Sequence, residues 1–575
     1  MAGIYGVLLK KNKEKQLYNT FYNRNFKNTL KQEICYHKFV FGRSVLKKFE
    51  EDRFLFENDD FIICFEGINH STIKKPSDFI EEYKRKGNKF INDLRGNFSG
   101  FIFEKLNEEL TLFTDTLASK SIYYFFDEKF GFAFASEMQV LSKLLRENGI
   151  SINYDYDGIY SLALYGQMFK NYTIVKEIKR LSYGSVIQFS NKENRLHKSK
   201  YYTFKKETEN ISKEEIIDSI DHLMVNAINK EWKKDELNNY NSKIALISGG
   251  MDSRVNALIA KKIGYENITG YTFGNPASSD VKIASEIASK NLNLHIQTHL
   301  HNGNFFIENI LENYVKSNDG LVHFTPSAII YNVYRHINFS DFGQLHSGQI
   351  GDALFGSLLR PKFNFKENSD KIGLTGFVKH QKMIDKINSI NEIIEEFNLS
   401  DYELFAYQER VVNGALTGDK QINNFIDHSS PFFNRELIDF MLSVPNKFKI
   451  NQQIYFDWLK AKHPDLLNYR WEKIGLKPNT NFNIKYGRLI KKYVNGGKKY
   501  FGLKYDSMNP ISIWLKSNPN ILVQFEKLFQ ENLSLIQDEE LRQDLTKIYK
   551  DDIFEYRNKF AVISVLLAIK LHFYS

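Results

Sequence analysis

The sequence predicts an α/β protein made of two parts. In the first part, residues 1–204, short β segments are separated by Asn, Asp and Gly. In the second part, residues 205–575, strands alternate with helices to about residue 360, and the chain is mostly helical from about residue 370. This alternation predicts a parallel sheet with helices on both faces. We therefore expect an α+β sandwich followed by a doubly wound parallel sheet with a helical C-terminal part.

Short apolar runs between turn-forming residues support the β prediction for the first part. Such runs favour strands because they are too short for helices and are bounded by chain-reversing residues. Examples are Phe61–Phe65, Phe98–Phe103, Leu110–Phe113 and Gly131–Ala135.

The pattern changes at Ser212, after which apolar residues recur at helical spacing from Ile216 to Ile228. A buried strand follows, then a Gly-rich turn and a helix that we expect to begin near Val255. A second strand, a second helix and a third apolar run come next. The strands are Ile244–Ile247, Ile268–Phe273 and Phe342–Leu345, and the second helix contains Ala284–Ser289.

The composition is that of a globular protein, with 42% hydrophobic and 26% charged residues among 575. A net charge of +9 spread over this length is weaker than the basic face of a nucleic-acid-binding protein, so we expect no nucleic acid partner. The longest late apolar run, Phe560–Ile569, is shorter than the ~20 residues that span a bilayer, so no transmembrane segment is expected. Cys35 and Cys64 are too few for a disulfide framework, which favours a cytoplasmic protein with both cysteines in the core.

A Gly-rich loop, Ser248 to Arg254, connects the first predicted strand of the second part to the next helix. Its glycines allow close approach of the backbone to a ligand, and N–H groups at a helix start favour phosphate. Asp252 would repel phosphate, unless it holds a divalent cation that phosphate oxygens share. The alternative is a tight strand-to-helix turn with a Ser cap.

A second Gly-rich loop, Ser347 to Gly356, follows the run Phe342–Leu345 and also carries one carboxylate, Asp352. The carboxyl ends of parallel strands share one edge of a sheet, so the two loops are expected to meet there. Two such loops, each with one Asp, match a clamp for a metal ion and a triphosphate.

The two loops, SGGMDSR and SGQIGDALFG, resemble the ATP-binding loops of the asparagine synthetase family. Further segments along nearly the whole chain are similar to that family: Gly3–Gly6, Phe90–Gly96, Phe134–Glu137, Ile178–Gly184, Tyr271–Gly274 with Asp280, and Ser430–Asn434. The resemblance implies an Ntn-type glutaminase-like domain over residues 1–204. It also implies an ATP-pyrophosphatase synthetase domain over residues 205–575.

Members of this family activate a carboxylate with ATP as an acyl-adenylate, release pyrophosphate, and let a nitrogen nucleophile displace AMP. The resemblance implies Mg²⁺ ligation by Asp252 and Asp352, and stabilisation of the reacting phosphates by Lys473. For Lys473 the alternative is a surface lysine in a turn. The residues implied to bind ATP are Leu246, Ser248, Gly249, Gly250, Asp252, Ser253, Phe273, Ser347 and Gly348.

The sequence also departs from the family pattern. Residue 2 is Ala2, where family glutaminases have the nucleophilic Cys, and the glutamine-binding turn is replaced by Phe65–Ile68. We therefore expect an N-terminal domain that folds but does not hydrolyse glutamine. Gln349 and Ala353 stand where the family has acids, and Gln cannot accept a proton from an amine. Gln349 is thus a candidate acceptor-pocket residue, and the base must be another group.

These features predict an ATP-dependent, AMP-forming carboxylate–amine ligase that uses ATP and Mg²⁺. Its substrates would be a small-molecule, peptide or sugar carboxylate and an amine or ammonia, in natural-product, peptide or surface-polysaccharide biosynthesis. The alternatives are a glutamine-hydrolysing asparagine synthase with an altered residue 2, a non-catalytic ATP-binding scaffold, and an enzyme that modifies tRNA. The sequence leaves a homodimer open.

A run of basic residues with interleaved tyrosines extends over residues 485–499. It is typical of a solvated helix face, and the alternative is a docking face for an anionic lipid-linked or peptide substrate.

Overall fold

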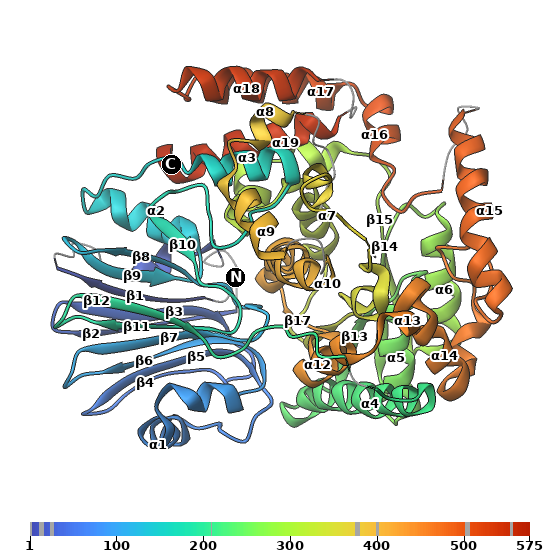
Figure 1. The fold of residues 1–575 in the computed structure, drawn as a ribbon, viewed down its shortest axis with the longest axis horizontal. Coiled ribbons are helices and arrows are strands. Elements are labelled where there is room, and N and C mark those ends of the chain that lie inside the picture. Colours follow the sequence, from blue (N-terminus) through green and yellow to red (C-terminus); the bar gives the residue numbers. More distant parts are fainter. Residues whose placement is uncertain are drawn as a thin grey trace.

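The fold is described from a computed structural model, which covers residues 3–10, 16–22, 28–208, 210–360, 362–373, 380–397, 402–500, 506–551 and 556–575. Only the backbone is described at Arg488 and over residues 498–500. A β sandwich from the N-terminal part lies beside a parallel sheet wrapped by helices (Figure 1).

The N-terminal part contains two six-stranded antiparallel sheets, with strand orders β10-β8-β9-β1-β3-β2 and β12-β11-β7-β6-β5-β4. The four apolar runs expected to be strands all lie in strands, β5, β6, β7 and β9. The strands are β1 Gly3–Leu9, β2 Thr29–Tyr36, β3 Phe39–Leu46, β4 Phe54–Glu57, β5 Phe61–Asn69, β6 Gly96–Glu104, β7 Glu109–Thr114, β8 Tyr123–Asp127, β9 Gly131–Ala135, β10 Ile178–Arg180, β11 Ser185–Ser190 and β12 Arg195–Lys200.

Alternating side chains of these strands fill the space between the two sheets with aromatic residues, among them Phe41, Phe101 and Phe134. Helix α1 (Pro76–Lys86) covers the outer face of one sheet, and α2 (Met138–Glu147) and α3 (Tyr156–Tyr165) cover the other. The predicted α+β sandwich is confirmed. Cys64 is buried in this sandwich, as expected. The prediction that Cys35 also lies in the core is wrong, because its side chain lies on the solvent side of β2 and is exposed.

The C-terminal part contains a five-stranded parallel sheet in the order β15-β14-β13-β16-β17. Helix α4 (Lys213–Leu237), capped by Ser212, packs with α5 (Asp252–Lys262) and α6 (Ser279–Asn291) on one face, and α7 (Phe324–Tyr334) packs on the other. The predicted doubly wound arrangement is confirmed. Its strands are β13 Ser242–Leu246, β14 Ile268–Gly274, β15 Leu294–His299, β16 Phe342–His346 and β17 Asp427–Ser429.

The strand order places a switch point between β13 and β16. The chain moves outward from β13 to β14 and β15, and then returns to add β16 and β17 on the opposite side of β13. The crossovers that leave β13 and β16 thus diverge, and a crevice forms at the carboxyl ends of these two strands. Both Gly-rich loops begin there, one after β13 and the other after β16.

The chain beyond residue 370 is mostly helical, as expected, with one exception. Strand β17 lies in this stretch and joins the sheet through parallel pairing with β16. The longer helices are α9 Asn388–Phe397, α12 Arg435–Ser443, α14 Gln453–Lys462, α15 Asn481–Tyr500, α16 Ile511–Ser517, α17 Asn520–Leu533, α18 Glu539–Lys550 and α19 Arg557–Ile569.

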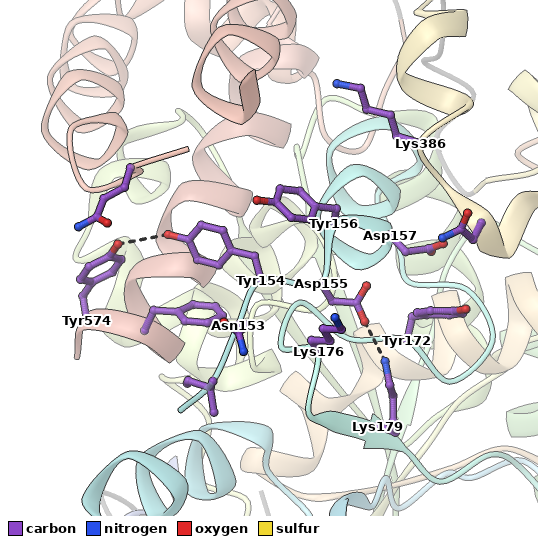
Figure 2. A pocket seen from close by; sticks show the side chains of 14 residues that line it. Asn153, Tyr154, Asp155, Tyr156, Asp157, Tyr172, Lys176, Lys179, Lys386 and Tyr574 are labelled. Carbon is purple, nitrogen blue, oxygen red and sulfur yellow. Dashed lines mark hydrogen bonds and ion pairs between the residues drawn. The ribbon is translucent and has the colours of Figure 1, made fainter. Parts of the chain in front are cut away.

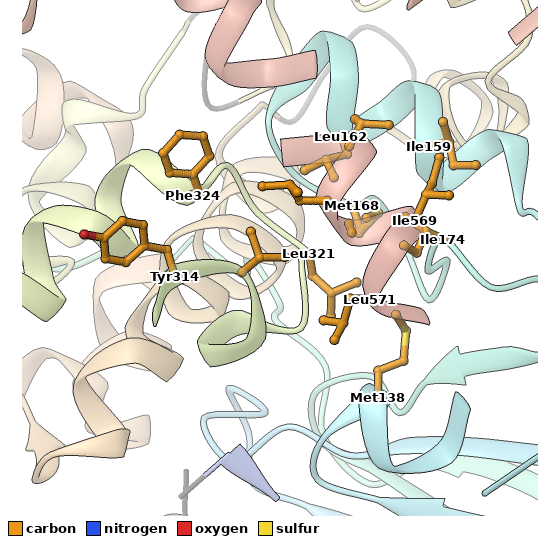
Figure 3. Close-up of a cluster of buried hydrophobic side chains, with 14 of the residues drawn as sticks. Met138, Ile159, Leu162, Met168, Ile174, Tyr314, Leu321, Phe324, Ile569 and Leu571 are labelled. Carbon is orange, nitrogen blue, oxygen red and sulfur yellow. The ribbon is translucent and has the colours of Figure 1, made fainter. Parts of the chain in front are cut away.

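Helix α19 joins the two parts of the molecule through a shared hydrophobic core (Figure 3). Ile569 and Leu571, from the end of the chain, pack in one cluster with Met138 of α2 and Leu162 of α3, and with Phe324 of α7. None of the helices within the described ranges has the length and apolar composition needed to cross a bilayer. The boundary at residues 204 and 205 stays a prediction.

Candidate active site

In the loop after β13, two serine hydroxyls accept hydrogen bonds from backbone N–H groups of the same loop. The backbone N–H of Ser248 donates to Oγ of Ser253 across 3.0 Å, and the N–H of Gly250 donates to Oγ of Ser248 across 3.1 Å. Helix α5 begins at Asp252 rather than near Val255, so Asp252 lies in its first turn. The loop therefore presents its backbone and hydroxyl groups at a helix N-terminus, which favours an anion.

Arg254 fixes this loop to a distant segment of the chain. Its buried guanidinium donates to the carbonyl oxygen of Gly249 across 3.1 Å and to that of Arg470 across 2.7 Å. Burial lowers the pKa of Arg254 to about 10, still well above neutrality. The N–H of Glu472 also donates to the Gly249 carbonyl, across 2.9 Å. The segment that carries Lys473 is thus held against the loop through Arg254 and by the Glu472 N–H.

The carboxylates of the two loops lie together, as the sequence predicts. The backbone N–H of Asp352 donates to Oδ2 of Asp252 across 3.1 Å, and the Tyr455 hydroxyl donates to Oδ1 across 2.8 Å. Lys473 Nζ lies 3.1 Å from Oδ2 of Asp352, although the Lys473 side chain is half exposed. The structure therefore brings Asp252, Asp352 and Lys473 into one cluster at the switch point.

Two glycines of the second loop allow this close approach. A Cβ on Gly348 would lie 2.3 Å from the backbone of Asp252 and Ser253, and a Cβ on Gly351 would lie 2.7 Å from Cγ of Asp252. Either contact would push the loops apart.

The electrostatics of the cluster favour a cation. Burial, and then the neighbouring Asp352 carboxylate, raise the pKa of Asp252 to about 7. No group of three or more His, Cys, Asp or Glu side chains that could hold a metal by themselves occurs in the described part of the chain. Two carboxylates are, however, the donor set that Mg²⁺ uses when phosphate oxygens and water complete its shell. Asp252 and Asp352 therefore fit Mg²⁺ bound together with a nucleotide.

A cavity of about 720 Å³ lies beside this cluster. Its lining includes Leu246 at the end of β13, Phe273 in β14 and Gln349 in the second loop. Leu246 and Phe273, two of the residues implied to bind ATP, and Gln349, the acceptor-pocket candidate, thus face one space. Other lining residues are His323, Ile330, Tyr334, Asp419, Ile422 and His428.

Asp419 and His428 are residues that the sequence analysis missed. Gln349 Nε2 donates to Oδ1 of Asp419 across 3.4 Å, and Oδ2 of Asp419 lies 3.2 Å from Nδ1 of His428. The other ring nitrogen of His428 lies 2.6 Å from Oγ of Ser347. The polar run Asp427-His428-Ser429, directly before the matched segment at Ser430, is the signal that would have found the histidine.

Buried charges surround the segment Phe65–Ile68, which stands in place of the family's glutamine-binding turn. Glu66 lies within β5, and its carboxylate is 3.3 Å from Nε of Arg53. Arg53 also lies 2.6 Å from Asp427 of β17, and Lys120 lies 2.9 Å from the same oxygen. Burial alone would raise the pKa of Asp427, but Arg53 and Lys120 hold it well below its usual range. Ala2 lies outside the described residues.

A second cavity, of about 750 Å³, opens between the segments around residues 152–157 and 172–179 and the C-terminal end (Figure 2). The lining residues form two contacts. Lys179 Nζ lies 2.8 Å from Asp155, and the hydroxyls of Tyr154 and Tyr574 lie 3.2 Å apart. None of the predicted site residues lines this cavity. The cavity at the switch point, which Leu246, Phe273 and Gln349 line, is therefore the candidate active site.

Comparisons with known proteins agree with this arrangement. Residues 71–202 match the family described as a glutamine amidotransferase domain, and residues 243–416 match asparagine synthase. No curated protein sequence matches the chain. The chain shows a weak likeness to a solved structure of the allosteric regulatory enzyme of purine biosynthesis, with 9% identity over 52% of this chain and 80% of that one and a TM-score of 0.24.

A second solved structure, glutamine phosphoribosylpyrophosphate amidotransferase from B. subtilis complexed with ADP and GMP, has 9% identity. The match covers 52% of this chain and 90% of that one, with a TM-score of 0.24. The two matched families, in this order along one chain, are those of an ATP-dependent, amide-forming ligase. The chain thus carries the two domains of the asparagine synthetase family, a glutamine amidotransferase domain over residues 71–202 and an asparagine synthase domain over residues 243–416.

Proposed function

We propose that the chain is an AMP-forming carboxylate–amine ligase that makes an amide without hydrolysing glutamine. The observation that carries this proposal is the contact between the two Gly-rich loops, where the Asp352 N–H donates to Asp252 and Lys473 stands 3.1 Å from Asp352. The cavity that Leu246, Phe273 and Gln349 line is large enough for a nucleoside and a second substrate.

ATP would bind with its phosphates on the loop after β13 and its nucleoside in the cavity. Phosphate oxygens would take over the N–H groups of Ser248 and Gly250, which in this structure donate to the hydroxyls of Ser253 and Ser248, and would contact Gly249 between them. Leu246 and Phe273 line the cavity, and Ser347 and Gly348 begin the facing loop. Asp252 and Asp352 would hold Mg²⁺, which when bound neutralises charge on the phosphates. Lys473 would place a positive charge beside the phosphate that leaves.

Asp419 and His428 would supply the base that Gln349 cannot. An amine must lose a proton as it attacks the acyl-adenylate, and the pair lines the same cavity as Gln349. The proton would move from the attacking nitrogen to the Asp419–His428 pair, whose facing atoms are 3.2 Å apart. Gln349 would orient the acceptor through its amide group and keep Asp419 in place.

The nitrogen would come from ammonia or from an amine on a substrate. Residue 2 is Ala2, which offers no thiol, and the Glu66 carboxylate lies 3.3 Å from Nε of Arg53. The carboxylate would belong to a small molecule, a peptide or a sugar. The N-terminal domain would serve the synthetase domain structurally, because its Arg53 and Lys120 neutralise Asp427 next to His428.

The experiment that tests this function separates adenylation from amide formation. Carboxylate-dependent exchange of labelled pyrophosphate into ATP reports the first step, and amide yield against pH reports the second. We expect His428→Gln and Asp419→Asn to keep the exchange and to lose amide formation near pH 7, with recovery towards about pH 9 where the amine is less protonated. Gln349→Glu should lower the rate at neutral pH, because it removes the amide that donates to Asp419 and places a second carboxylate beside it. Equal pH profiles in all four proteins would place the base elsewhere.

A further inference from the structure

Helix α15, Asn481–Tyr500, stands on the outer edge of the molecule, on the side away from the N-terminal sandwich (Figure 1). One of its faces rests on the body of the protein. Ile484 is buried there, Gly487 lies against Ile474, and Lys491 Nζ lies 3.0 Å from Glu472. The remaining faces of the helix point away from these contacts.

Six large apolar side chains cover the outer side of α15. They recur at i, i+4, i+7, i+8, i+11 and i+12, which is the spacing of a single helix face. Soluble proteins rarely leave such a continuous apolar surface in water. We call this set the α15 stripe, and its members with their exposed fractions are Phe482 67%, Tyr486 40%, Leu489 49%, Ile490 54%, Tyr493 78% and Val494 49%.

The stripe is accompanied by positive charge and by no negative charge. Lys485 and Lys492 are exposed, and residues 481–500 contain no Asp or Glu. Lys491, which does have acidic partners, faces inward to Glu472 and Asp506. An apolar helix face beside exposed lysines is complementary to a surface that offers both hydrocarbon and anionic groups.

We propose that α15 binds the surface of an anionic lipid bilayer, lying in the plane of the headgroups. The stripe would insert between lipids, and Lys485 and Lys492 would contact their phosphates. A second copy of this chain is a poorer partner, because two such helices would bring lysines together with no carboxylate on either. The proposal does not depend on the proposed function, since binding to lipid requires no catalysis.

Docking at α15 would hold the active site close to the membrane. Lys491 of α15 contacts Glu472, and the Glu472 N–H donates to Gly249 in the loop after β13. Helix α15 is therefore two contacts away from the predicted phosphate-binding loop.

The test is co-sedimentation of the purified protein with sucrose-loaded vesicles. One preparation contains phosphatidylglycerol and phosphatidylcholine, and the other contains phosphatidylcholine alone. We expect binding to the anionic vesicles about tenfold stronger than to the neutral ones, and weaker binding as salt rises. The double variant Leu489→Ser and Tyr493→Ser should lose about tenfold in binding, and so should Lys485→Glu with Lys492→Glu.

The matched control is Leu106→Ser with Leu237→Ser, which removes two leucines elsewhere on the surface that are 78% and 61% exposed. It should bind like the original protein, and all variants should keep the original melting temperature. Absence of binding to the anionic vesicles would overturn the proposal, as would equal binding by the control and stripe variants. A dimer that dissociates on changing the stripe, with no lipid binding, would show that a second copy covers it instead.

Discussion

The backbone N–H of Asp352 donates a hydrogen bond to Oδ2 of Asp252 across 3.1 Å, so the loops that follow β13 and β16 meet at their acidic residues. Gly348 and Gly351 make this contact possible, because a Cβ at either position would collide with Asp252. The two loops therefore act as one unit, and a change in either carboxylate should affect the same ligand.

The first prediction concerns the metal–nucleotide site. Asp252→Asn and Asp352→Asn keep the size of the side chain but remove the negative charge that Mg²⁺ requires. Each should abolish Mg²⁺-dependent binding of ATP measured by calorimetry, while the circular dichroism spectrum stays unchanged. Asp59→Asn, at an exposed site in the N-terminal domain, is the control and should bind normally. Undiminished binding in both site variants would rule out the clamp.

The second prediction concerns Lys473, which lies 3.1 Å from Asp352 but is half exposed. If its charge stabilises the phosphates in the transition state, Lys473→Met should lower the rate of AMP formation at saturating ATP by roughly 10²-fold or more. ATP affinity should change much less, because the interaction strengthens as the reaction proceeds. Lys477→Met, an exposed neighbour on the same segment, should have no effect. A loss confined to ATP affinity would make Lys473 a binding residue only.

The third prediction concerns the N-terminal domain. The purified protein should release no glutamate from glutamine, with or without ATP, because residue 2 is Ala2. Ala2→Cys should not restore the activity, since Glu66 is bound to Arg53 in place of the family's glutamine-binding residues. Glutamate produced above background after repurification would instead support a glutamine-hydrolysing enzyme.

The fourth prediction concerns stability in acid. His572 is buried between Ser142 and the Asp319 carbonyl, and burial lowers its pKa to about 4 from an ordinary value of 6.5. Between these pH values the unfolded chain binds more protons than the folded one, so stability is complete above about pH 6.5 and falls as the pH falls towards 4. The loss from this residue is of the order of 3 kcal/mol.

This loss can be measured as the melting temperature at pH 7 and at about pH 4.5. His572→Gln cannot take up the proton, so its melting temperature should fall less between the two conditions than that of the original protein. His222→Gln, at an exposed position on α4, should leave the difference unchanged. Equal acid sensitivity in the original protein and the His572 variant would assign the loss to other groups, of which His323 is the next candidate.

The sequence predicted those parts of the fold that depend on local pattern. The apolar run Ile244–Ile247 and the Gly-rich loop after it predict a strand end, and the parallel sheet then requires that loop to meet the one containing Asp352. Strand β17 was missed because Asp427–Ser429 is short and polar, and only pairing with β16 makes it a strand. Tyr455 and Asp419 were also missed because local pattern does not show contacts between distant segments. Each reaches the site through packing of a helical segment that is distant in sequence.

The most direct test of the central claim is the identity of the products made from ATP. The protein is incubated with ATP, Mg²⁺, an ammonium salt and candidate carboxylates labelled with ¹⁸O, and the products are followed by ³¹P NMR. We expect AMP and pyrophosphate in equal amounts, with ¹⁸O transferred from the carboxylate to AMP, and neither product with Asp252→Asn. ADP and phosphate as products, or AMP without the label, would contradict the central claim.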